Sequence, residues 1–413
     1  MLMEASEAVG GNNSSDRLTD RICIGVLADV IPSDLVEEVL AETGALQQRT
    51  RLLLARVVVY FVLALSLFFD DAYEETMCKL VQGLSAMRAW RSDWHVPTAS
   101  ALCQARRRLG ERPLRRLFER VALPIAAPGA PGAWLAGWRL MAIDGVQMDV
   151  ADTAENDAMF GRTFKAKLPA PYPQTRVVGL GECGTHAIVA AAIGGCMTGE
   201  RELTRELLGA VEPDMLVIAD RGFYSYQLWA EAAETGAQLL WRVSASLKLP
   251  VLEAYPDGSY RSVLIDTIER QRVRRARLRG QVREPVGVSV RVIDYQVLDR
   301  PGSGETVRLL TTIADPNVVS AAELAAVYAQ RWEFEISLAE LELRQRGPGR
   351  VLRSQNPETV RQEIWAMLLV HYAVRVLMAR VAADHDTDPD RVSFIRSLRI
   401  IRRHVTAQAA FSP

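Results

Sequence analysis

The sequence predicts a mixed α/β protein preceded by an all-helical N-terminal domain, on three observations. From about residue 18 to residue 121 the apolar residues recur at helical spacing. Residues 127–134 read APGAPGAW, and this Pro/Gly repeat predicts a linker because it cannot continue a helix. Beyond the linker, short runs of β-branched residues alternate with helical segments, which is typical of an α/β sheet.

Length, charge and cysteine usage exclude several classes of protein. A chain of 413 residues with 49% hydrophobic and 24% charged residues is long enough for two or three folded domains. Its net charge of -1 excludes a uniformly basic protein that total charge holds to polyanions. The five cysteines form no CxxC pair, which is typical of a reduced cytoplasmic protein. The longest apolar run, 57–69, is too short to span a bilayer and predicts a buried helix.

Start and stop signals place the individual elements. In the N-terminal part, helices are expected to begin near residues 33, 100 and 113. Strands are expected at 138–144, 146–150, 175–180, 185–193, 214–220 and 238–243, with helices at 200–210 and 223–236. Residues 244–317 are expected to form β hairpins, followed by helices over 320–346, 357–381 and 388–407.

Two aspartates are the first candidates for chemistry. Asp144 and Asp220 each end an apolar strand pattern, in AIDG and ADRG. Side chains that leave the carboxyl ends of strands gather at one edge of an α/β sheet. A divalent cation between the two carboxylates would relieve their repulsion and desolvation, and hard oxygen ligands suit Mg²⁺. The alternative is that each aspartate only caps a turn or a helix.

A third group of candidates lies in YAQRWEFEISLAELELR, residues 328–344. Tyr328, Arg331 and Glu335 are spaced by three and four residues, so they share one stripe of a helix. An arginine one turn before a glutamate can orient that carboxylate and hold a phosphate, although a salt-bridged surface helix is the alternative. Two aspartates, a glutamate and two metal ions suffice for in-line attack on a phosphodiester. If Glu335 is not the ligand, Glu333 or Glu340 would be.

Arginines that could contact DNA phosphates are concentrated in three stretches of this net-neutral chain. Besides 87–120, these are 270–283, with seven arginines, and 391–403, with five arginines and no acid. We expect Arg106, Arg107 and Arg108 in the first stretch to bind DNA. The alternative for any single stretch is a solvated surface.

The segment GLGECG, residues 179–184, matches a dinucleotide-binding pattern and follows a predicted strand. That pattern requires a helix after the glycines, whereas THAIVAAAI has the character of a strand. A hairpin turn is therefore expected. The five histidines show no metal-ligand spacing, and we assign them no role.

Over nearly its whole length the chain resembles the insertion element 4 group of bacterial DDE transposases. The similar segments are DRICIGVLADVIPSDLVEEVL, ALCQARRRLG, RLMAIDG, RVVGLGECGTHAIVAA, ADRGFYSYQLW, the Tyr-Arg-Glu stretch and RVLRSQNPETVRQEIWAMLL. The resemblance implies a ribonuclease-H-like core with a β-rich insertion. It also implies that Asp144, Asp220 and Glu335 are the catalytic, metal-binding triad. Tyr328 and Arg331 match the start of the family's Tyr-Arg-Glu-Lys signature and would contact DNA.

The resemblance also implies a function, partners and domain limits. The protein would bind the terminal inverted repeats of its element in double-stranded DNA, cleave there with two Mg²⁺ ions or Mn²⁺ as a substitute, and join the 3′ hydroxyl to target DNA. It would act at the nucleoid in the cytoplasm as a homodimer assembled on DNA ends, without a membrane. The expected parts are a disordered lead-in (1–17), a helical DNA-binding domain (18–126), the linker (127–134), the first part of the core (135–243), the insertion (244–317), the core helix with the glutamate (318–346) and the C-terminal helices (347–413).

Two departures from the family pattern leave an alternative open. Glu342 stands where the signature expects a lysine, seven residues past Glu335, and would repel a phosphate if the α-helix continues. The chain also ends at TAQAAFSP, earlier than expected of relatives. The alternative is an impaired or truncated copy that only binds DNA.

Overall fold

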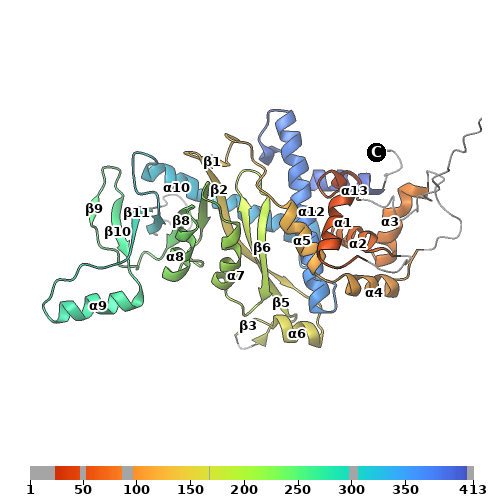
Figure 1. Cartoon of the computed structure of the whole chain (residues 1–413), viewed down its shortest axis with the longest axis horizontal. Coiled ribbons are helices and arrows are strands. Elements are labelled where there is room, and N and C mark those ends of the chain that lie inside the picture. Colours follow the sequence, from red (N-terminus) through yellow and green to blue (C-terminus); the bar gives the residue numbers. More distant parts are fainter. Residues whose placement is uncertain (1–23, 47–52, 86–95, 167, 297–305, 407–413) are drawn as a thin grey trace, which may run out of the picture.

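The computed structural model describes residues 24–46, 53–85, 96–166, 168–296 and 306–406. Figure 1 shows three parts in a row, with helices at one end, a β-sheet in the centre and a smaller β-rich part at the other end. The expected lead-in, residues 1–17, and part of the first arginine-rich stretch lie outside the described residues.

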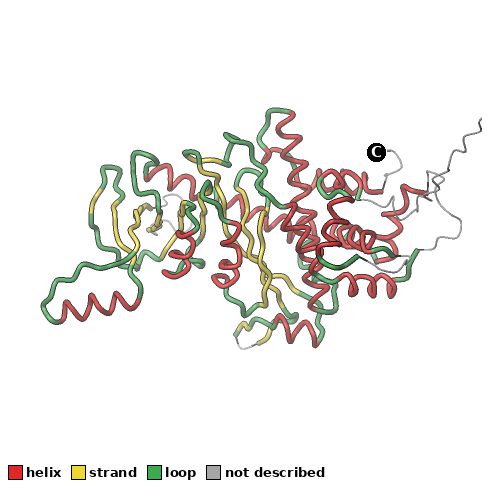
Figure 2. Tube along the Cα trace, in the orientation of Figure 1, coloured by secondary structure: helices red, strands yellow, loops and turns green. Residues whose placement is uncertain are grey.

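The N-terminal and C-terminal helices share one apolar core. Figure 2 shows these helices packed together at one end of the molecule. The predicted buried helix is α2, which is surrounded by other helices and buried almost throughout. α12 is long and apolar enough to cross a membrane by length and composition, but 78% of its most apolar window is buried inside the protein. The elements are η2 (Gly25–Asp29), α1 (Ser33–Glu42), α2 (Ala55–Leu67), α3 (Tyr73–Ser85), α4 (Ala99–Leu109), α5 (Arg112–Val121), α12 (Pro357–Asp384), η5 (Pro389–Arg391) and α13 (Phe394–Thr406).

The central sheet has ten strands within the described ranges, in the order β6-β5-β2-β7-β8-β12-β11-β10-β9, with β1 paired to β2. β2, β5 and β6 are antiparallel neighbours, whereas β7 and β8 run parallel to β2 on its other side. This is the ribonuclease-H-like arrangement that the resemblance implied. The strands are β1 (Trp134–Leu135), β2 (Trp138–Asp149), β5 (Gln174–Glu182), β6 (Ile188–Gly195), β7 (Met215–Ala219), β8 (Gln238–Val243), β9 (Glu253–Ala254), β10 (Tyr260–Leu264), β11 (Val288–Gln296) and β12 (Thr306–Thr311).

Shorter elements connect the strands of the core. The expected helices at 200–210 and 223–236 are α7, followed by a 3-10 turn, and α8. α6 and a small hairpin separate β2 from β5. Their bounds are α6 (Ala154–Phe160), β3 (Phe164–Lys165), β4 (Leu168–Pro169), α7 (Glu200–Leu207), η3 (Leu208–Ala210) and α8 (Tyr226–Glu234).

Residues 244–317 differ from the expected β hairpins in two respects. They include a helix, α9 (Thr267–Leu278), which begins where the Asp266 side chain accepts a hydrogen bond from the backbone N–H of Glu269. Arginine is a good helix former, and this cap satisfies a free N–H, which explains why a helix forms here. In addition, β12 pairs with β8, so the insertion extends the central sheet.

The predicted helix over 320–346 consists of three segments. α10 (Ala321–Ala329) starts with a capping box, α11 (Arg331–Ala339) follows after a break at Gln330, and η4 (Glu340–Arg346) is π-helical. The GPGR segment ends η4 as expected, because Gly347 and Gly349 adopt positive φ angles.

Phe334 fixes the position of α11 on the sheet. Its ring lies over Gly179 and Gly181, alternate residues of β5 that face the same side. A Cβ on Gly181 would lie 2.0 Å from that ring. β5 and β6 form the antiparallel pair expected for the GLGECG segment, which is therefore not a dinucleotide site. Gly179 and Gly181 instead make room for Phe334 of α11.

Arg106 does not face solvent, which corrects its assignment as a DNA-binding residue. It is buried between α4 and α12 and donates hydrogen bonds to the side chains of Gln362, Ser354 and Tyr73 and to the carbonyl of Thr359. The position of Arg106 on an amphipathic helix could not reveal its burial, because three of its acceptors belong to residues about 250 positions away. Arg107 and Arg108 are exposed.

Replacing Arg106 should destabilise the fold. Arg106→Ala leaves several buried acceptors without their donor, so we expect the free energy of unfolding to fall by about 2–4 kcal/mol in denaturant titrations. Arg107→Ala is the control on the same helix and should change it by less than about 0.5 kcal/mol. Equal unfolding curves for the two variants would contradict the buried position of Arg106.

Adding a methyl group at Gly181 should displace Phe334. We expect Gly181→Ala to lower the free energy of unfolding by about 1–3 kcal/mol through overpacking. Gly209→Ala is the control, since a Cβ there would meet no atom within 4 Å. Combining Gly181→Ala with Phe334→Leu should recover part of the loss, and purely additive losses would argue against direct packing.

Candidate active site

The two predicted aspartates lie side by side, although for a different reason than expected. β2 does not end at Asp144 but continues to Asp149. Only the parallel pairing of β2 with β7 ends before Asp144, and the last residue pair in it is Ile143 with Ala219. Asp144 and Asp220 are the next residues of these two neighbouring chains, and paired strands lie about 4.8 Å apart.

The side chain of Asp144 lies on the face of the sheet that α11 covers. Asp144 is opposite Gly179 in the ladder between β2 and β5, and opposite residues point to the same face. Since Gly179 faces Phe334 of α11, Asp144 points to the helix that also carries Glu335.

Arg331 connects two of the three carboxylates. Its Nη1 lies 3.4 Å from Oδ2 of Asp144 and 2.6 Å from Oε1 of Glu335. The pair Arg331–Glu335 has the i, i+4 spacing seen in the sequence. A guanidinium remains charged throughout the accessible pH range, so it reduces the repulsion between the two acids.

Tyr328 and Arg242 contact the remaining carboxylate. The hydroxyl of Tyr328 donates to Oδ1 of Asp220 at 3.1 Å, and Nη1 of Arg242 lies 3.9 Å from the same oxygen. Burial raises the pKa of Tyr328, and the charge of Asp220 raises it further, so the hydroxyl stays protonated and can donate. Arg242 was not among the predicted residues. A single charge inside the apolar strand QLLWRV is the sequence signal that could have identified it.

The local electrostatics leave Asp144 short of compensating positive charge. Burial raises the pKa of Asp144 to about 6, and the charges of Glu335 and Asp220 add to the increase. The N–H of Gly145, 2.8 Å from Oδ1, and the charge of Arg331 act in the opposite direction but do not cancel it. A set of hard oxygen donors with excess negative charge fits a divalent cation.

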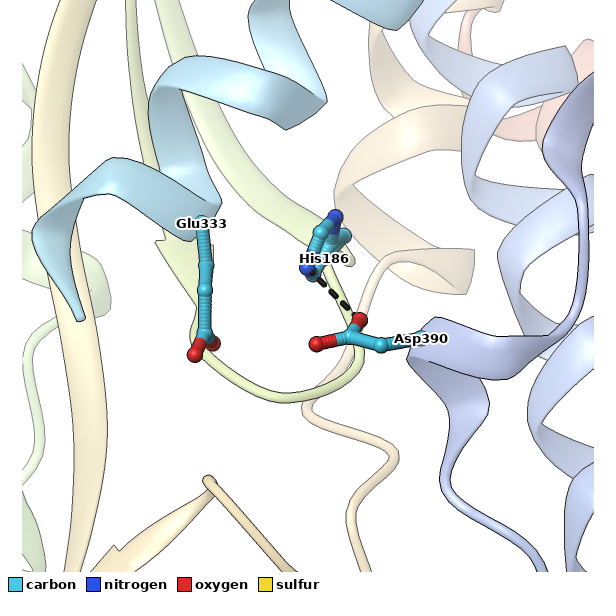
Figure 3. A group of neighbouring side chains, drawn as sticks. All are labelled: His186, Glu333 and Asp390. Atoms are coloured by element: carbon cyan, nitrogen blue, oxygen red, sulfur yellow. Dashed lines mark ion pairs between the residues drawn. The ribbon is translucent and has the colours of Figure 1, made fainter.

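Glu333 points away from this site. Its Oε2 accepts a hydrogen bond from the N–H of Gly184 at 2.7 Å. Figure 3 shows its carboxylate near His186 and Asp390, and ligand atoms of these three residues lie within 4.8 Å of one another. This position does not favour Glu333 as the alternative to Glu335.

Contacts within the protein account for this neighbouring cluster without a metal ion. Nη2 of Arg375 donates to Nδ1 of His186 at 2.7 Å. Because a guanidinium has only donors, the imidazole proton must be on Nε2, which lies 2.9 Å from Oδ1 of Asp390. A metal ion would need the lone pair of that nitrogen. The sequence showed no role for His186, since its partners are distant along the chain.

Glu340 is also engaged in this network. Burial alone would raise the pKa of Glu340, but the hydrogen bond from His371 and the charge of Arg375 hold the pKa below its usual value. Nε of Arg375 lies 3.0 Å from Oε2 of Glu340. Glu340 therefore anchors the end of α11 to α12 and is not placed as an alternative to Glu335.

Glu342 is not the uncompensated carboxylate that the sequence predicted. The π-helix begins at Glu340, so α-helical spacing no longer places Glu342 on the stripe of Glu335. Its Oε1 lies 3.2 Å from Nη2 of Arg346, whose side chain is only 2% exposed. Glu342 thus compensates a buried guanidinium.

Comparisons with known proteins identify the family of this chain. Residues 21–119 match the family model "Insertion element 4 transposase N-terminal", and residues 178–372 match "Transposase DDE domain". Asp220 and Glu335 lie within the second match, whereas Asp144 lies between the two.

Two curated relatives come from Escherichia coli K12. The chain is 29% identical over 391 residues to the transposase InsG for insertion sequence element IS4. This match covers 94% of this chain and 84% of InsG. It is 24% identical over 221 residues to the putative transposase InsZ, and this match covers 53% of this chain and 71% of InsZ. A cryo-EM structure of the piggyBac transposase synaptic complex with hairpin DNA has a TM-score of 0.48 and 11% identity, covering 93% of this chain and 80% of that one.

The two family models describe the N-terminal and catalytic parts of one kind of protein, and the similarity to InsG extends across both. The chain therefore belongs to the insertion element 4 family of DDE transposases, which are metal-dependent enzymes that cleave DNA.

Proposed function

We propose that this transposase uses Asp144, Asp220 and Glu335 to cleave DNA at the terminal inverted repeats of its insertion sequence and to transfer the freed 3′ hydroxyl to target DNA. The observation that carries the proposal is the convergence of these carboxylates around Arg331 and Tyr328, together with the raised pKa of Asp144.

The three carboxylates would hold two Mg²⁺ ions, with Mn²⁺ as a substitute. When bound, the ions would stabilise the charge on the scissile phosphate and activate water or the 3′ hydroxyl. Arg331 orients Asp144 and Glu335, and Tyr328 orients Asp220 through its hydroxyl. Because both side chains contact the carboxylates, we expect them also to contact a DNA phosphate bound there.

Double-stranded DNA is the partner, both as the element ends and as the target. Arg107 and Arg108, which are exposed on α4, remain candidates for contacts with the ends. A homodimer assembled on two ends, acting at the bacterial nucleoid, would allow both ends to be processed together.

A copy that only binds DNA is the competing proposal. A supercoiled plasmid carrying the element ends, incubated with the protein and Mg²⁺, separates the two. Nicking at the ends supports catalysis, whereas end binding without nicking supports the competing proposal. The Glu342–Arg346 ion pair compensates the charge of Glu342, which weakens the argument that this carboxylate repels a DNA phosphate.

Loss of any triad carboxylate should abolish cleavage but spare DNA binding. We expect Asp144→Ala, Asp220→Ala and Glu335→Ala each to slow nicking by at least about 1,000-fold, equivalent to about 4 kcal/mol of transition-state stabilisation. DNA affinity should change little, because most phosphate contacts lie elsewhere. Glu333→Gln is the matched control: it retains an acceptor for Gly184 and should still nick. Comparable losses in that control would argue against the assignment of Glu335.

Neutralising Asp144 should stabilise the metal-free protein in a pH-dependent way. The pKa of Asp144 is about 6 in the folded protein and 3.8 ordinarily, so the charged carboxylate destabilises the folded state. This loss of folding free energy is absent below about pH 4, grows up to about pH 6 and is complete above that pH. In buffer with EDTA, Asp144→Asn should raise the free energy of unfolding at pH 7.5 by up to about 3 kcal/mol.

Denaturant titrations at pH 4, 5 and 7.5 measure this gain. The gain should shrink toward pH 4, and Mg²⁺ should raise the Tm of the parent more than that of the variant. A gain that is the same at all three pH values would show that the charge of Asp144 is not its cause.

A further inference from the structure

Helix α9 carries a dense group of exposed positive charges. Figure 1 places it at the end of the molecule opposite the N-terminal helices, projecting below β10 and β11. Only Glu269 is acidic within the helix, and it is buried. The exposed arginines on α9 and directly after it are Arg270, Arg272, Arg274, Arg275, Arg277 and Arg279.

Ion pairing within the protein neutralises little of this charge. Glu269 already accepts two hydrogen bonds from Arg283, at 3.0 and 3.1 Å, and lies 3.5 Å from Arg272. Among the described residues, the other arginines of α9 have no ion-pair partner. Like charges on successive turns destabilise a helix, so an external anion would stabilise it.

The arginines are arranged in rows. Arg270, Arg274 and Arg277 follow each other at four and three residues, so they lie on one stripe that extends about 10 Å along the helix. A row of fixed guanidinium groups matches the regularly spaced phosphates of one nucleic-acid strand, and each guanidinium can bind a phosphate through two hydrogen bonds.

The first arginine of this row acts electrostatically on a tyrosine that follows Asp220 in the chain. Burial raises the pKa of Tyr224, and Arg270 is close enough for its charge to act in the opposite direction. Tyr224 lies four residues after Asp220, in the turn that leads from β7 to α8. The first arginine of the stripe is therefore within electrostatic range of the segment that follows Asp220.

We propose that α9 binds the backbone phosphates of the double-stranded DNA that enters the active site, on the side opposite the N-terminal helices. This inference rests on the proposed function. Arginine contacts to phosphates position a duplex without reading its sequence, so α9 would hold element ends and unrelated DNA alike.

The test uses the full-length Arg274→Gln/Arg277→Gln variant and two fluorescent 40-base-pair duplexes, one with an element end and one of unrelated sequence. We expect affinity near 100 mM NaCl to fall at least about tenfold for both duplexes. The slope of log affinity against log salt should decrease by up to about 2. The matched control, Arg205→Gln/Arg261→Gln, also removes two charges, from arginines that pair with Glu231 and Glu253, and should bind like the parent.

Hydroxyl-radical footprinting on the element-end duplex locates the contact. The α9 variant should lose protection at a few adjacent backbone positions and keep the rest of the footprint. Affinity and salt slope equal to those of the parent would overturn the proposal, and so would an equal loss in the control variant. Failure of the parent to nick DNA would speak against the proposed function, whereas parental binding by the variant speaks against α9 alone.

Discussion

Repulsion among three carboxylates at the end of the β2–β7 pair is the constraint on which the rest of the site depends. Asp144 and Asp220 come together because their strands are paired, and α11 brings Glu335 to the same face. One guanidinium, that of Arg331, contacts two of these acids and leaves the pKa of Asp144 raised. The protein thus holds an unfavourable charge arrangement that a divalent cation would relieve, which is the usual relation between stability and function at such sites.

An arrangement of this kind persists only if the helix that completes it is firmly held. Packing holds the middle of α11, because Phe334 occupies the space left by Gly179 and Gly181 of β5. Hydrogen bonds hold both sides, through Glu333 to Gly184 and through Glu340 to Arg375 of α12. The cluster in Figure 3 therefore has a positioning role beside the site.

Arginines serve two different purposes in this chain. Arg106 and Arg375 are buried and connect elements that are distant in the sequence, since each can satisfy several acceptors at once. The arginines of α9 are exposed and have few acidic neighbours, so their charge is available to an anion. This division explains how a net-neutral protein can offer a localised phosphate-binding surface.

The sequence by itself determined the element types of the core and singled out the residues that form the candidate site. Alternating apolar patterns and local spacing carry this information, and Asp144, Asp220, Tyr328, Arg331 and Glu335 do lie together. Only the tertiary structure decided which arginines are buried, because the partners of Arg106 lie on α12. It also decided that Arg346 is buried, so that Glu342, four residues earlier, pairs with a buried guanidinium. Local patterns report the periodicity of one segment, whereas burial and ion pairing depend on which distant segment packs against it.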